Sequence, residues 1–136
     1  MHGTISIERQ ELIATQLLAQ SIAGSILCNR TLDTIVQHNV AMYGSSGHAI
    51  ADDDSIRLAI QTLHHTTIVD NATAATALAI MQQGLIDRAE NGQTTDTLVR
   101  EIVAIYGGKG EKMFSDDELR AFMRTILPKS VASRAA

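Results

Sequence analysis

Apolar residues recur every three to four positions along most of the chain, which is the spacing that places them on one side of an α-helix. Six stretches follow this pattern, at about residues 6–28, 32–43, 55–69, 71–90, 95–106 and 116–127. Polar capping residues and glycines separate the stretches. We therefore expect an all-α fold, a single-domain helical bundle of five to six helices over residues 1–128, followed by a flexible basic tail over residues 129–136.

Short polar motifs predict where several helices begin and end. Ser115 with Glu118 has the spacing of a capping box, in which each residue binds a free backbone N–H of the first helical turn. Asp52 has the chemistry of an N-cap at the start of the third helix. Glycine at position 44 ends the second helix, and residues 44–48 are expected to form a flexible connection. The glycine-rich residues 107–112 are expected to form a linker, because they lack the frame of a phosphate-binding loop.

Three of the predicted helices carry more apolar surface than one core-facing stripe requires. The helix over residues 6–28 has a second apolar side that includes Ile13 and Leu17. The helix over residues 71–90 is apolar around most of its circumference, with a large face of Ala74, Leu78, Met81 and Leu85, and it is the expected centre of the bundle.

The helix over residues 55–69 is the third of these. Its core-facing residues are expected to be Ile56, Ala59, Ile60 and Leu63. The opposite side also carries apolar residues, and an isolated amphipathic helix would not place them in water.

This excess predicts association with another protein surface, most simply a second copy of the chain. The candidate contact residues are Leu17, Leu58, Thr62, His65 and Val69. The function expected from this pattern is a non-enzymatic interaction module, a regulator, inhibitor or adaptor that acts by surface contact and forms a homodimer.

Composition and charge narrow the alternatives. Aromatic residues make up 3% of the chain and tryptophan is absent, so an aliphatic core is expected. The formal net charge of −4 opposes non-specific binding to nucleic acid. Charge is nevertheless uneven, because every charged residue after position 119 is basic: Arg120, Arg124, Lys129 and Arg134. A DNA-associated helical regulator that uses these four residues is the alternative function, although the acidic start of the last helix would repel phosphate.

Candidate catalytic and metal-binding groups do not form a recognisable pattern. The five histidines lack the spacing of known metal-binding motifs, and no nucleophile stands beside a base in a catalytic motif. We expect neither a catalytic site nor a cofactor. Cys28 has no second cysteine to pair with and is expected to be a buried structural thiol.

The chain is expected to be cytoplasmic and not inserted in a membrane. Its first ten residues lack the charged and apolar regions of a secretory signal. Residues 12–29 are uncharged, but polar side chains are spread around that predicted helix and would lack partners in hydrocarbon.

Overall fold

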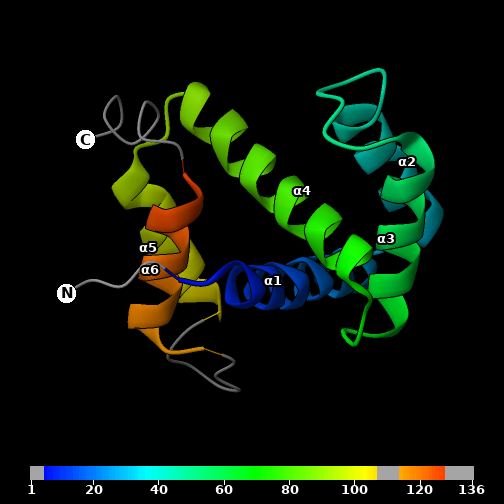
Figure 1. Cartoon of the computed structure of the whole chain (residues 1–136). Coiled ribbons are helices and arrows are strands. Elements are labelled where there is room, and N and C mark those ends of the chain that lie inside the picture. The colour runs from blue at the N-terminus through cyan, green and yellow to red at the C-terminus, as the bar shows by residue number, and fades with distance from the viewer. Residues whose placement is uncertain (1–4, 107–113, 128–136) are drawn as a thin grey trace. The chain divides into compact units, whose positions relative to one another are not determined.

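The computed structural model describes residues 5–106 and 114–127, and within these ranges the regular structure is entirely α-helical. Figure 1 shows the helices, which are α1 (Ile7–Leu27), α2 (Leu32–Tyr43), α3 (Asp53–His65), α4 (Asn71–Glu90), α5 (Thr95–Tyr106) and α6 (Asp116–Ile126). The prediction of an all-α fold is confirmed. The predicted linker at residues 107–112 and the predicted basic tail at residues 129–136 lie outside the described residues.

Two helices end in the backbone pattern known as the Schellman motif, in which a residue with positive φ turns the chain back on the last helical turn. Asn29 takes this role after α1, with φ 69°, and its N–H donates to the carbonyl of Ile26 (3.0 Å). Gly92 does the same after α4, with φ 100°, and its N–H donates to the carbonyl of Ala89 (3.1 Å). Asparagine and glycine tolerate positive φ better than other residues, so the sequence marks both ends.

The start of α6 follows the predicted cap only in part. The backbone N–H of Glu118 donates to the Ser115 hydroxyl (3.1 Å), which is one half of a capping box. The Glu118 carboxylate forms an ion pair with Arg9. Phe114 and Leu119, which flank this cap, are both buried and have the spacing of a hydrophobic staple.

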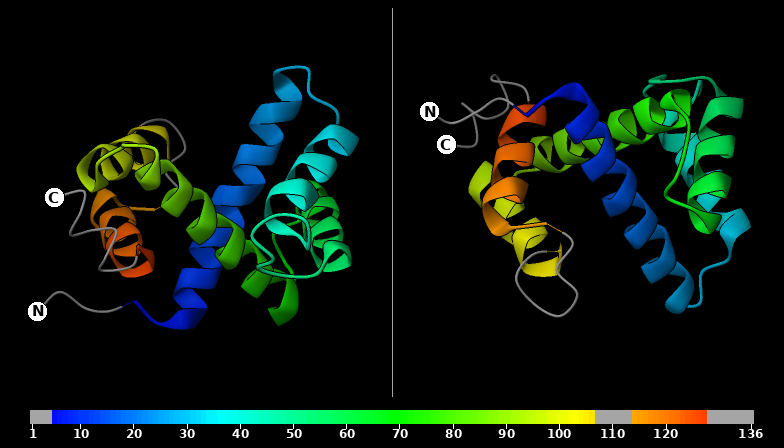
Figure 2. Two further views of the ribbon diagram at one scale, coloured as in Figure 1. Left: turned by 90° about the horizontal axis from the view of Figure 1, so that it is seen from above. Right: turned by 60° about the horizontal axis from the view of Figure 1, so that its bottom comes forward.

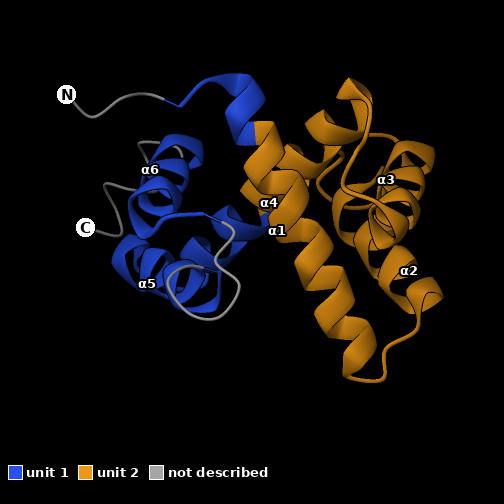
Figure 3. Ribbon diagram, turned by 90° about the horizontal axis from the view of Figure 1, so that it is seen from below, with its two compact units in different colours: residues 1–10, 84–136 blue, residues 11–83 orange. Residues whose placement is uncertain are grey.

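The described chain divides into two compact units, coloured separately in Figure 3. Unit 1 comprises Met1–Gln10 and Gly84–Ala136, and unit 2 comprises Glu11–Gln83. Helices α1 and α4 each contribute residues to both units, because each crosses a boundary in sequence.

Unit 2 has a core built from four helical segments. Within it α2 and α3 pack side by side (Figure 2). Its buried core cluster takes side chains from α1, α2, α3 and α4: Leu18, Ile22, Ile35, Val36, Ile56, Ile60, Leu63, Ala77 and Ile80. The predicted inward face of α3 is confirmed, since Ile56, Ala59, Ile60 and Leu63 are all buried.

The connection between α2 and α3 is fixed by hydrogen bonds, which the prediction of a flexible connection did not anticipate. The N–H of Gly47 donates to the carbonyl of Gly44 (3.0 Å), and the Asp53 carboxylate accepts from the N–H of Ser45 (2.8 Å). A Cβ atom at position 47 would lie 2.2 Å from the carbonyl oxygen of Met42, so only glycine fits there. This connection ties the start of α3 to the end of α2.

Unit 1 contains a second apolar interior. Helices α5 and α6 pack together in it. Its buried side chains are Leu85, Leu98, Val99, Ile102, Phe114, Leu119, Phe122, Met123, Ile126 and Leu127. On α5 and α6 these residues recur every three to four positions, so each helix buries one side in this interior.

The buried side of α4 agrees with the predicted one only at Leu85, which is buried. Ala77 and Ile80 reach the core of unit 2, whereas Ala74, Leu78 and Met81 are half-buried. A helix that is apolar on most sides has no strong amphipathic phase, so the surrounding helices decide which residues face the core. No helix within residues 5–106 and 114–127 combines the length and apolarity needed to span a bilayer.

Two aspartates that cap helices make stability depend on pH. The side chain and the N–H of Ser55 bind Asp52 and hold its pKa below the ordinary value, and the N–H and side chain of Thr73 do the same for Asp70. A carboxylate whose pKa is lowered by folding stabilises the protein above its unfolded-state pKa of about 4, and that contribution is lost as the pH falls through the folded-state pKa.

We expect the double variant Asp52→Asn, Asp70→Asn to lose less stability than the wild type between pH 6 and about pH 3. Asparagine caps helices as well as aspartate does but cannot be protonated in this range, so the two proteins should be similar at pH 6. Urea unfolding at both pH values measures the difference. An equal loss in both proteins would contradict this account.

Candidate interaction surface

Helix α3 presents two opposite faces because of the spacing of its residues. Its N-cap is Asp52, whose carboxylate accepts from the N–H of Ser55 (2.7 Å). With its core-facing side buried, the opposite side carries exposed residues at intervals of four, three and four positions. We call these residues the outer stripe of α3: Asp54, Leu58, Gln61 and His65.

The apolar member of the outer stripe is Leu58, and 57% of its surface is exposed. Exposed leucines occur singly on many proteins, but a half-exposed leucine between polar neighbours on a well-packed helix gains free energy when another surface covers it. The other large hydrophobic residues exposed in the described ranges are Ile7, Leu12, Leu27, Ile68 and Ile105.

The structure brings two of the predicted contact residues together on this stripe and separates the others. Leu58 and His65 lie on the outer stripe, and Thr62 lies beside it and is half-buried. Leu17 is fully buried, with an exposed fraction of 0%, so it has no area to offer to another molecule and its assignment to the contact surface is corrected. Asp54 and Gln61 belong to the stripe, and the sequence prediction missed both.

Val69 also leaves the predicted surface, because α3 ends earlier than expected. Thr66 is extended, with φ −157° and ψ 153°, and closes the helix after His65. Val69 then packs partly buried against the core of unit 2, while Ile68 is 90% exposed. The run of four β-branched residues at 66–69 disfavours a helix and was the sequence signal for this ending.

Charge is distributed unevenly along α3. Its first turn carries Asp53 and Asp54, and its last turn carries His64 and His65, whose rings meet edge to face with centroids 4.8 Å apart. Asp54 also forms an ion pair with Arg57 (3.0 Å), but both side chains are well exposed, so this pair stabilises the helix weakly. The outer stripe therefore has an acidic end, an apolar and amide centre, and an imidazole end.

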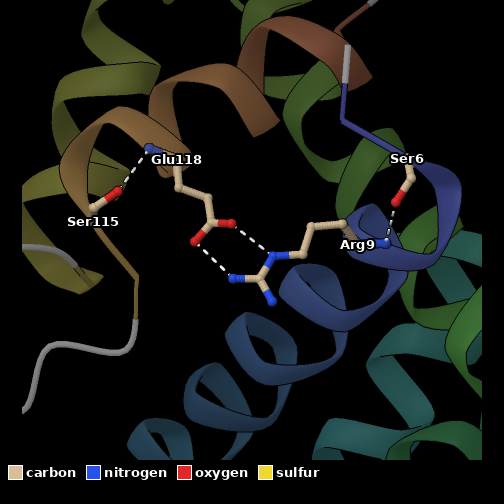
Figure 4. A network of polar contacts seen from close by, with 4 residues as sticks. All are labelled: Ser6, Arg9, Ser115 and Glu118. Atoms are coloured by element: carbon tan, nitrogen blue, oxygen red, sulfur yellow. Dashed lines mark hydrogen bonds and ion pairs between the residues drawn. The ribbon is translucent and has the colours of Figure 1, made fainter. Parts of the chain in front are cut away.

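Arg9 and Glu118 form a polar cluster in unit 1 (Figure 4). Two nitrogens of the guanidinium donate to the two carboxylate oxygens, at 2.6 and 2.9 Å, and the guanidinium also lies 5.5 Å from the centre of the Phe114 ring. The hydrogen bond to Glu118 raises the pKa of Arg9. This bidentate ion pair joins the start of α1 to the start of α6 within unit 1.

The basic residues of the DNA-binding alternative are only partly described. Arg124 is exposed on α6 and Arg120 is half-buried, while Lys129 and Arg134 lie outside the described residues. The first turn of α6 is acidic, with Asp116 and Asp117 beside Glu118. DNA binding stays an untested prediction.

Cys28 is exposed, which corrects the prediction of a buried thiol. It follows the last turn of α1, where Leu27 is 85% exposed and a Cβ at position 24 would touch nothing within 4 Å. In the described ranges, no three histidine, cysteine, aspartate or glutamate side chains are grouped so that they could hold a metal ion.

Comparison with known proteins adds no relative: no family, curated protein or solved structure matches this chain.

Proposed function

We propose that this protein is a non-enzymatic interaction module that acts by surface contact, as a regulator, inhibitor or adaptor, and that it self-associates through the outer stripe of α3. The observation that carries the proposal is Leu58, which is 57% exposed on the side of α3 opposite a fully packed core face. Burial of this side chain against a partner would remove apolar surface from water.

The contact expected from this stripe is small. Helix α3 has 13 residues, which corresponds to a length of about 20 Å. Stable dimers typically bury about 800 Å² on each partner. We expect a contact centred on one short helix to bury less than this. We therefore expect self-association with a dissociation constant in the micromolar range.

Sedimentation velocity over a micromolar concentration series tests the proposal. The wild-type chain is expected to approach twice its monomer mass of 14.6 kDa, and Leu58→Asp is expected to remain monomeric because a buried carboxylate would lack a partner. Leu27→Asp is the matched control, since Leu27 is also exposed and belongs to unit 2 but lies outside the outer stripe. Equal association of Leu58→Asp and the wild type would refute the proposed surface.

A further inference from the structure

The outer stripe of α3 has a symmetric spacing, which suits a second copy of the same helix. Its residues are spaced by four, three and four positions, so the stripe has the same spacing when read in either direction. The spacing is also that of a coiled-coil seam, in which side chains of two helices interlock along one line. A second copy of α3 in the opposite direction would place each position of the stripe against another position of the stripe.

The chemistry of the stripe matches this arrangement. An antiparallel copy would bring Asp54 opposite His65 of the second copy at both ends of the contact. The imidazole N–H of a histidine donates to a carboxylate, so each end would gain a polar pair. At the centre, Leu58 would lie opposite Gln61 of the second copy. The two leucines would be three helix positions apart, about 4.5 Å along the axis, which is close enough for contact.

We propose that two copies of this chain pair through antiparallel α3 helices related by a twofold axis, with Asp54 of each copy against His65 of the other and the two Leu58 side chains in contact at the centre. This inference rests on the proposed function, because it specifies the partner and the orientation for the same surface. A parallel pairing would instead place carboxylate against carboxylate and imidazole against imidazole. In the twofold arrangement both copies use the same surface for the contact.

A charge exchange in the full chain tests the orientation. Asp54→Lys places an ammonium group against His65 of the second copy, and His65→Asp places two carboxylates against each other. Each single variant is expected to raise the dissociation constant of the dimer about tenfold, which corresponds to about 1.4 kcal/mol. The double variant Asp54→Lys, His65→Asp places an ammonium group against a carboxylate in the antiparallel arrangement, so its dissociation constant should return to within about threefold of the wild type.

Asp33→Lys is the matched control for the change at position 54. Asp33 is exposed at the second position of α2, as Asp54 is at the second position of α3, and both substitutions change the net charge equally. We expect this variant to dimerise like the wild type. Far-UV circular dichroism of each variant verifies that the helices are retained, and sedimentation velocity measures the dissociation constants.

The outcomes separate this inference from the proposed function. A double variant as weak as the single variants would overturn the antiparallel pairing, and so would single variants that dimerise normally. If Leu58→Asp still abolishes association in those cases, the surface stands and only the orientation fails. If the wild-type chain stays monomeric up to several hundred micromolar, the proposal that a second copy is the partner is wrong.

Discussion

Replacement of Phe122 by alanine is expected to lower the free energy of unfolding by about 3–5 kcal/mol, the range measured for large aromatic residues in protein cores. Phe122 is the largest fully buried side chain of the described residues, and its neighbours in sequence on α6, Leu119, Met123 and Ile126, are also buried. Removal of the ring loses its transfer free energy and leaves a cavity that the surrounding side chains fill only in part. Urea unfolding followed by circular dichroism measures the loss.

Ile105→Ala is the control for this variant. Ile105 lies on α5 in the same unit, but 65% of its surface is exposed, so truncation should change the free energy of unfolding by no more than about 0.5 kcal/mol. A loss below about 1 kcal/mol for Phe122→Ala would mean that the interior of unit 1 is not closely packed around the ring.

Helix boundaries were predictable because they depend on a few neighbouring residues. Ser115 caps α6, Gly92 ends α4 and Asp52 caps α3, as their chemistry indicates. Leu127 takes an extended conformation, with ψ 125°, as expected for the residue before a proline. The end of α3 differs from the predicted one because the helical spacing of apolar residues continues past His65, whereas the β-branched residues that follow disfavour a helix.

Burial was harder to predict, because it depends on residues that are distant in sequence. The hydrophobic pattern identified the second apolar side of α1 correctly but could not show what covers it, and the structure buries both Ile13 and Leu17. The same limit explains Cys28, since no local pattern reveals that Leu27 and Cys28 are exposed at the end of α1. Only part of the apolar excess inferred from the sequence remains exposed, and on α3 that part is Leu58.

The candidate surface could likewise be predicted only in part from neighbouring residues. Helical periodicity alone placed Leu58 and His65 on one side of α3, and the structure keeps them there. Asp54 and Gln61 share that side by the same periodicity, but neither is apolar, so the hydrophobic pattern does not mark them. The acidic and imidazole ends of the stripe can be recognised as a pair only after the core-facing and exposed sides of α3 are known.

Leu17→Ala separates the two roles that an apolar residue of this chain can have. Because Leu17 is fully buried, we expect its truncation to lower the free energy of unfolding by about 2–5 kcal/mol and to leave the dissociation constant of the dimer unchanged. Leu58→Ala should do the reverse, weakening self-association while changing the stability of the monomer by no more than about 0.5 kcal/mol.

Both measurements must be made under conditions that keep the two effects apart. Dimer formation stabilises the folded state by mass action, so urea unfolding should be measured at concentrations well below the dissociation constant. Sedimentation velocity in the absence of urea then reports association of the folded chains. If Leu17→Ala dissociated the dimer without loss of monomer stability, the second apolar side of α1 would be an intermolecular contact.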